Sequence, residues 1–324
     1  MFTAKELLEM VNHYISEWHY SHEPKGLYQP IEYVLSLGGK RIRPLLMLMA
    51  YNLYKEDVHD ILPAAVGLET YHNYTLLHDD LMDKADMRRN KPTVHKLWGE
   101  NTAILSGDTM LVLAYEQLCK VDARHLRTVL RIFCQTALEI GEGQQYDMDF
   151  ETRDDVTEDE YIEMIRLKTS VLLAAALQIG ATLADASAQD AENLYKYGIQ
   201  IGLAFQLQDD YLDVYGDEAV FGKKIGGDIL CNKKTYMLIN AFQRADAAQR
   251  AELKYWIEAS EYDAAEKIRA VTALYDAIGI RQMCHRKIAE YFERSASYLN
   301  AIQVDDSRKA ILREFVHTLM HRNV

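Results

Sequence analysis

The distribution of proline most constrains what this chain can fold into. All five prolines, at positions 24, 30, 44, 63 and 92, lie in the first third of the 324 residues. No proline occurs from residue 93 to 324. Because proline breaks helices and removes a sheet hydrogen bond, its absence over this length permits a succession of long helices. Ala, Leu, Glu, Lys, Met and Gln are frequent there, which also favours helix.

The most apolar stretch, residues 171–184, shows the same preference. Its residues Leu172, Ala175, Ala176 and Ile179 follow the i, i+3, i+4, i+7 spacing of one buried helix face. The stretch is about 14 residues long, too short to span a bilayer, so it suits a core helix. No strand pattern, repeat or linker is evident. We therefore predict one all-α domain over residues 1–324.

The overall charge limits the possible partners. With 36 Lys and Arg against 49 Asp and Glu, the formal charge is −13, so the surface should repel nucleic acid and anionic membrane. An anionic substrate would need a local cationic pocket or bound metal. The four cysteines form no CxxC pair, and the first residues are acidic where a signal peptide would be apolar. These features predict a reduced, cytoplasmic protein without stable membrane insertion.

Two aspartate clusters stand out, each with the pattern Asp-Asp-x-x-Asp after an apolar helical run. The first and last aspartates of each pattern are i and i+4, so their carboxylates lie about 6 Å apart on one helix face. Like charges at this spacing require a counter-charge, and oxygen ligands of this kind suit Mg²⁺ or Mn²⁺. A solvated acidic face is the alternative for one copy, but two copies in apolar surroundings favour metal sites. The candidate metal ligands are Asp79, Asp80, Asp83, Asp209, Asp210 and Asp213.

Cations accompany these clusters. Residues 38–44 read Gly-Gly-Lys-Arg-Ile-Arg-Pro, and Lys40 and Arg43 are i and i+3. Arg88 and Arg89 follow the first cluster closely. Such cations are ordinary on a surface, but beside aspartates they favour a phosphate site. Residues 216–228, with four glycines and two lysines after the second cluster, have the composition of a mobile lid.

Taken in order, these motifs resemble the trans-prenyltransferases, the polyprenyl diphosphate synthases that include farnesyl and geranylgeranyl diphosphate synthases. The resemblance runs from Gly38 to about Lys234. It also covers Lys168-Thr169, Phe205-Gln206 before the second cluster, and Lys224 with Gly226 and Asp228. It implies a bundle of long helices around a deep cavity, a homodimer, and three Mg²⁺ ions for which Mn²⁺ could substitute.

The resemblance also implies residue roles. Asp79, Asp83 and Asp209 would ligate Mg²⁺ directly, and the other three aspartates would support them. The allylic diphosphate would be held by Arg88, Lys168 and Lys224. The diphosphate of isopentenyl diphosphate would be held by Lys40, Arg43, His72 and Arg89. Thr169 and Gln206 would turn their oxygens towards the reacting carbons.

The implied reaction is dissociative. The allylic C–O bond breaks to give a carbocation, the double bond of isopentenyl diphosphate attacks it, and the departing diphosphate accepts a proton. Apolar walls would keep water away from the cation.

Product length can be inferred from the helix that leads into the first cluster. Tyr74 lies five residues before Asp79, about 7.5 Å along the helix axis, with Tyr71 one turn deeper. Thr75 occupies the nearer position, where an aromatic tends to give farnesyl length in the family. This arrangement favours a C20 product over C15, although both tyrosines could simply pack against neighbouring helices.

Four alternatives are compatible with parts of the sequence. Synthesis of chains beyond C25 is disfavoured by Tyr74 but stays open. A class I terpene cyclase uses one aspartate-rich motif, but would not need the second copy or the residue 38–44 cations. A phosphohydrolase could be built from His72 and His78-Asp79 but leaves the second cluster unexplained. A non-catalytic partner subunit would normally have lost aspartates or cations, and none is missing here.

Overall fold

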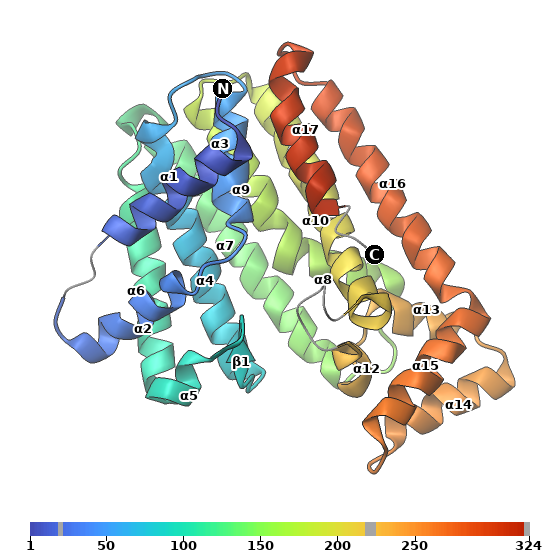
Figure 1. Cartoon of the computed structure of the whole chain (residues 1–324). Coiled ribbons are helices and arrows are strands. Elements are labelled where there is room, and N and C mark those ends of the chain that lie inside the picture. The colour runs from blue at the N-terminus through green and yellow to red at the C-terminus, as the bar shows by residue number, and fades with distance from the viewer. Residues whose placement is uncertain (19–21, 218–224, 321–324) are drawn as a thin grey trace. The chain divides into compact units, whose positions relative to one another are not determined.

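Helices form nearly all the regular structure in the computed structural model, which describes residues 1–18, 22–217 and 225–320 (Figure 1). The chain divides into two units. Unit 1 comprises Met1–Cys134, Ala175–Leu194 and Ile302–Leu312, and unit 2 comprises Gln135–Ala174, Tyr195–Ala301 and Arg313–Val324. The all-α prediction is confirmed, while the single domain over residues 1–324 stays a prediction.

Unit 1 is built around the helix that carries the first aspartate cluster, α4 (Leu62–Met82). Pro63 lies in its first turn, where a missing N–H costs no hydrogen bond. Helices α2, α3 and α6 pack against α4. The elements that begin in this unit include α1 (Ala4–Glu17), α2 (Lys25–Ser36), α3 (Ile42–Asn52), η1 (His59–Ile61), β1 (Met87–Arg88), β2 (Lys91–Pro92), α5 (Val94–Trp98), α6 (Glu100–Leu118), α7 (Ala123–Glu151) and α17 (Asp306–Met320).

The strands β1 and β2 were not expected from the sequence. They pair antiparallel, with Met87 opposite Pro92 and Arg88 opposite Lys91. Arg89 and Asn90 join them at φ 51° and 59°, the left-handed conformation of a tight two-residue hairpin. Two residues per strand are too few to show an alternating pattern, which is why this hairpin leaves no recognisable strand signal in the sequence. The hairpin follows the C-terminal end of α4 (Figure 1).

Unit 2 contains the second aspartate cluster near the end of α10 (Ala188–Tyr215). Its helices begin with strong local signals: capping boxes at Thr157 with Glu160 and at Asp246 with Gln249. Gly279, at φ 85°, separates α15 from α16. The other elements of this part of the chain are α8 (Glu158–Ile165), the π-helical turn η2 (Arg166–Ser170), α9 (Val171–Leu183), α12 (Gly227–Leu230), α13 (Tyr236–Arg244), α14 (Ala247–Glu258), α15 (Ala264–Ile278) and α16 (Ile280–Asn300).

The predicted core helix is α9. Leu172, Ala175, Ala176 and Ile179 are all buried, with at most 2% of their surface exposed. The helical run 158–183 is long and apolar enough to cross a membrane, but 78% of its most apolar window is buried within the protein. A core helix explains its composition without a membrane.

Candidate functional site

The first aspartate cluster lies at the C-terminal end of α4. Asp79 and Asp80 are in the last turn, and Asp83 is the C-cap residue, whose N–H donates to the Asp79 carbonyl at 2.9 Å. Asp83 is exposed, whereas Asp80 keeps only 6% of its surface accessible. A helix C-terminus already carries partial negative charge, so carboxylates gathered there demand cations.

One of those cations is Arg88, on the β1–β2 hairpin. Its Nε lies 2.8 and 2.9 Å from the two carboxylate oxygens of Asp80, and its Nη2 lies 3.7 Å from Asp79 Oδ2. Burial raises the pKa of Asp80, while the guanidinium opposes that rise. The carboxylate of Asp80, the middle aspartate of the cluster, is therefore paired with Arg88 in this structure.

Further cations gather around His72, which lies about two helical turns before Asp79 in α4. Arg43 Nη1 lies 3.0 Å from His72 Nε2. Burial lowers the pKa of His72 well below 6.5, and nearby Arg43, Arg89, Arg88 and Arg41 lower it further. The ring is therefore neutral at pH 7, and Nε2 accepts the hydrogen bond from Arg43.

Arg43 itself is short of partners. Burial lowers its pKa to about 10. Its Nε is buried and has no hydrogen-bond partner within the described residues. A buried guanidinium N–H without an acceptor is costly, and an anionic oxygen would satisfy it. This observation fits the predicted diphosphate-binding role of Arg43.

The glycines before Arg43 hold Arg89. The Arg89 side chain donates to the Gly38 carbonyl. Gly39 has φ +132°, and a Cβ there would lie 2.9 Å from Arg89 Cζ. Glycine thus lets the guanidinium lie directly on the backbone. Lys40 is exposed in the same turn. The Arg89 side chain therefore lies against the Gly38–Gly39 turn that Lys40 follows, and Arg43 pairs with His72.

Arg41 has a different role from its neighbours. It starts α3 with a left-handed backbone, φ 48°, and its side chain forms an ion pair with Glu69 at 3.0 Å. Both side chains are 2% exposed. It also donates to the Leu35 carbonyl at 2.7 Å. Arg41 and Glu69 fix the turn that presents Lys40 and Arg43.

The aromatic residues of α4 form a stacked group. Tyr74 lies 5.5 Å from Tyr71 and 4.8 Å from His78, between ring centroids. Tyr71 is buried and lies 5.0 Å, edge on, from Phe133 of α7. The hydroxyl of Thr75 donates to the His72 carbonyl at 2.8 Å. The tyrosines thus also pack against a neighbouring helix, as the alternative interpretation allowed.

In the second aspartate cluster, as in the first, the middle aspartate is buried. Asp210 is 3% exposed, and both its carboxylate oxygens accept hydrogen bonds from the protein, from Tyr161 and from Gln206. Burial raises the pKa of Asp210 to about 7, and the nearby Asp228 adds to the rise. Asp213 accepts from the backbone N–H of Asp228 at 2.9 Å.

Lys168 and Thr169 lie on the π-helical turn η2. Lys168 Nζ donates to Asp147 Oδ2 at 2.6 Å, and the Thr169 hydroxyl donates to Gln206 Oε1 at 3.0 Å. A Cβ on Gly143 would lie 2.4 Å from the Lys168 backbone nitrogen, so glycine lets α7 approach this turn closely. The predicted pair Thr169 and Gln206 is therefore in direct contact.

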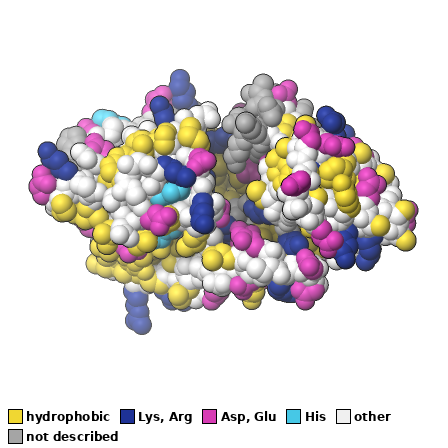
Figure 2. Space-filling model, turned by 90° about the horizontal axis from the view of Figure 1, so that it is seen from below, with side chains coloured by type: hydrophobic (Ala, Val, Ile, Leu, Met, Phe, Trp, Pro, Cys, Tyr) yellow, Lys and Arg dark blue, Asp and Glu magenta, His cyan; other side chains and the backbone are white. Residues whose placement is uncertain are grey.

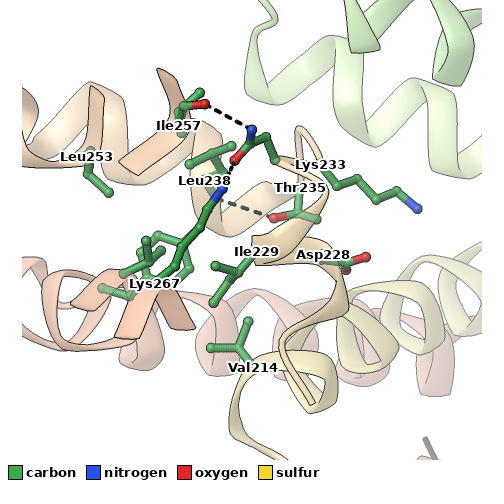
Figure 3. Close-up of a pocket in the computed structure, with 12 residues that line it drawn as sticks. Val214, Asp228, Ile229, Lys233, Thr235, Leu238, Leu253, Ile257 and Lys267 are labelled. Atoms are coloured by element: carbon green, nitrogen blue, oxygen red, sulfur yellow. Dashed lines mark hydrogen bonds between the residues drawn. The ribbon is translucent and has the colours of Figure 1, made fainter. Parts of the chain in front are cut away.

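The segment that follows the second cluster, around Asp228 and Asn232, is held by hydrogen bonds to α14 and α15. Lys267 is 1% exposed and donates to Asn232 Oδ1 at 2.7 Å, while Asn232 donates to the Ile257 carbonyl at 3.1 Å (Figure 3). These residues line a pocket with apolar walls that include Val214 and Leu253 (Figure 3). The contacts hold the stretch that carries Asp228, whose backbone binds Asp213. Lys224, also predicted as a ligand, lies outside the described residues.

The side chains fit divalent metal without forming a closed metal cage. Within the described residues, no three His, Cys, Asp or Glu side chains converge. Mg²⁺ typically binds one or two carboxylates and completes its shell with water and substrate phosphates, so an open aspartate cluster suits it. Charges of both signs intersperse on the face seen in Figure 2.

The sequence interpretation missed several residues: Glu69, Asp147, Tyr161 and the backbone of Asp228. Asp147, Tyr161 and Asp228 bond the predicted site residues Lys168, Asp210 and Asp213. Glu69 pairs with Arg41, the residue after Lys40. A lone Asp or Tyr on a helix carries no pattern, so only Asp228 had a sequence signal, through its place in the glycine-rich loop.

The chain is similar to known proteins over most of its length. Residues 24–275 match the family model described as polyprenyl synthetase. The chain is 48% identical to a geranylgeranyl diphosphate synthase of Methanosarcina mazei over 223 residues, covering 68% of this chain and 69% of that one. It is 36% identical to a short chain isoprenyl diphosphate synthase of Methanothermobacter thermautotrophicus, covering 96% and 95%. A crystal structure of a geranylgeranyl pyrophosphate synthase superposes with TM-score 0.95 at 42% identity, covering all of both chains.

Proposed function

Since the chain belongs to the polyprenyl synthetase family and is a short-chain prenyltransferase, we propose that it joins isopentenyl diphosphate to allylic diphosphates and releases mainly geranylgeranyl diphosphate. The proposed primers are dimethylallyl, geranyl and farnesyl diphosphate. The observation that supports the product assignment is the aromatic group of Tyr74, Tyr71 and Phe133, in which Tyr71 contacts both other rings, together with the small Thr75 next to Tyr74 in α4. The terpene-cyclase and phosphohydrolase alternatives have no support, because the matched family and relatives are prenyl synthases.

We assign the isopentenyl diphosphate to the cations of unit 1. Arg43, with its unpartnered buried Nε, would donate to a phosphate oxygen, and the neutral His72 would hold the Arg43 guanidinium in place. Arg89 lies over Gly39, and Lys40 extends from the same loop. Arg43, Arg89 and Lys40 give three positive groups in an acidic chain, and these create the local attraction that a diphosphate needs.

The allylic diphosphate is assigned to Arg88, Lys168 and Lys224. Arg88 and Lys168 each pair with a carboxylate, Asp80 and Asp147. Pairing keeps each cation oriented, and the several N–H donors of a guanidinium or ammonium group allow it to bind a carboxylate and a phosphate together. Asp79, Asp83 and Asp209 would hold three Mg²⁺ ions, supported by the remaining aspartates of the clusters. Bound Mg²⁺, or Mn²⁺ in its place, neutralises charge on the diphosphate leaving group.

The remaining side chains act on the carbon skeleton. Thr169 and Gln206 would direct their oxygens towards the allylic carbon as positive charge develops there. Apolar walls would exclude water, which would otherwise capture the cation. The proton lost after attack by isopentenyl diphosphate passes to the departing diphosphate, so no side-chain base is required.

The product assignment is tested by changing Tyr74. Tyr74→Ala removes the ring and should shift the products to C25 and longer chains, whereas Tyr74→Phe keeps the ring and should leave C20 dominant. Products from each primer are identified by mass after incubation with Mg²⁺ and isopentenyl diphosphate. A C15 product from the unaltered chain would contradict the interpretation of Thr75, and an unchanged distribution in Tyr74→Ala would contradict the role of Tyr74.

The alternative of a non-catalytic partner subunit is tested in the same assay. The purified chain alone should condense the substrates, and activity should vanish with EDTA and in Asp79→Ala. Absence of condensation with every primer would make the partner-subunit role the better explanation. No nucleic-acid partner is proposed.

A cytoplasmic homodimer is also proposed. Helix α6 exposes Ile104, Leu105 and Val112, which are 43%, 59% and 66% accessible. Leu105 and Val112 are seven residues apart and share a helix face, as a helix-packing surface requires. A second copy of the chain would cover this face. Val112→Asp should yield monomers in light scattering, and an unchanged mass would contradict this surface.

A further inference from the structure

The middle aspartate of the second cluster is directed into the protein. Asp210 Oδ2 accepts from the Tyr161 hydroxyl, and Asp210 Oδ1 accepts from Gln206 Nε2 at 3.0 Å. Asp210 is 3% exposed and Tyr161 is 1% exposed. Both carboxylate oxygens are engaged, so Asp210 serves as an internal acceptor.

The contact with Asp210 determines which way the Gln206 amide points. An amide carries a donor nitrogen on one side and an acceptor oxygen on the other. Gln206 Nε2 donates to Asp210, so Gln206 Oε1 must face the opposite way, where the Thr169 hydroxyl donates to it at 3.0 Å. Rotating the amide by half a turn would place its oxygen against a carboxylate and break the bond to Asp210.

Tyr161 is well placed to hold this arrangement. It lies in the first turn of α8, where its N–H donates to the Thr157 carbonyl at 3.1 Å and a capping box fixes the helix start. Its hydroxyl donates to Asp210, and both side chains are buried. The first cluster differs, because there the middle aspartate is held by the cation Arg88.

We propose that Tyr161 is a positioning residue for the prenyl transfer: through Asp210, it holds the Gln206 amide with its oxygen on the Thr169 side. The inference rests on the proposed function in assigning Gln206 and Thr169 to the allylic cation. Tyr161 itself touches neither the substrates nor the reacting atoms in this assignment. Its effect should therefore appear in the rate of transfer and depend on Gln206.

Tyr161→Phe removes only the hydroxyl and tests the rate. We expect kcat to fall about tenfold, the size of one lost positioning hydrogen bond, with KM for isopentenyl diphosphate unchanged. Tyr197→Phe is the matched control, because Tyr197 is a buried tyrosine of α10 outside this network. Its kcat should stay at the wild-type value. Thermal unfolding of both variants checks that they fold.

A double-mutant cycle tests the route of the effect. In a Gln206→Leu background, Tyr161→Phe should lower kcat by less than about twofold further, because coupled residues are not additive. A full tenfold loss in that background would show that Tyr161 acts independently of Gln206 and would overturn the proposal. No loss of kcat in the single variant would overturn it as well.

A measurement without turnover separates this inference from the proposed function. In ¹⁵N-labelled protein, the side-chain N–H₂ protons of Gln206 should exchange with solvent slowly, and at least about tenfold faster in Tyr161→Phe. This result is expected even if the chain catalyses no condensation. Equal exchange rates in both proteins would refute the positioning role, whatever the activity.

Discussion

Breaking the buried ion pair between Arg41 and Glu69 on one side only should destabilise unit 1 strongly. The charged atoms lie 3.0 Å apart, and each side chain is 2% exposed. Arg41→Met leaves a buried carboxylate whose Oε2 already has no partner within the described residues. Removing one partner of a buried pair typically costs about 3–5 kcal/mol, so this variant should lose that much free energy of unfolding. Against a total of about 5–15 kcal/mol, the loss is large.

The double variant Arg41→Met with Glu69→Met should recover much of this loss. Removing both charges abolishes the uncompensated carboxylate, and buried ion pairs repay little beyond their own desolvation. The remaining cost includes the lost hydrogen bond from Arg41 to the Leu35 carbonyl, about 1 kcal/mol. We therefore expect the double variant to be more stable than Arg41→Met by about 2 kcal/mol.

Urea unfolding followed by circular dichroism gives the free energies by linear extrapolation. Arg294→Met is the matched control, because its partner Glu290 and Arg294 itself are about half exposed, 45% and 59%. Its loss should be within about 1 kcal/mol. A loss below about 1 kcal/mol in Arg41→Met, or strictly additive losses in the double variant, would refute the argument from burial.

Three further predictions concern pH, binding and packing. Below pH 6.5 His72 takes up a proton in the unfolded chain but stays neutral in the folded protein, where its pKa is lowered. The free energy of unfolding should therefore decrease as the pH is lowered, by up to about 1.4 kcal/mol per pH unit. His72→Gln should remove this contribution to the slope measured by urea unfolding. Gly39→Ala would place a Cβ 2.9 Å from Arg89 Cζ, so steady-state kinetics should show KM for isopentenyl diphosphate raised about tenfold, with the allylic KM unchanged. Gly180→Ala would place a Cβ 2.2 Å from the Met47 carbonyl oxygen and should cost about 1–3 kcal/mol, whereas Gly26→Ala, with open space around it, should not.

Much of this protein was determined by local sequence features. The proline-free length, the apolar periodicity of residues 171–184 and the capping residues depend on neighbours within a few positions, so helices could be predicted from them. The order of the aspartate, lysine and arginine motifs was likewise sufficient to indicate the family. The short β1–β2 hairpin was missed, because two paired residues per strand leave no periodic pattern.

Only the tertiary structure decided which aspartate of each cluster turns inward. The spacing of Asp80 and Asp210 is the same in both clusters, yet one is held by an arginine and the other by Tyr161, 49 residues away. The partner of Lys168, Asp147, also lies 21 residues before it on another helix. Helical periodicity specifies the face from which a side chain projects. The donor that meets it there depends on how separate helices pack, and that information is spread over the whole core.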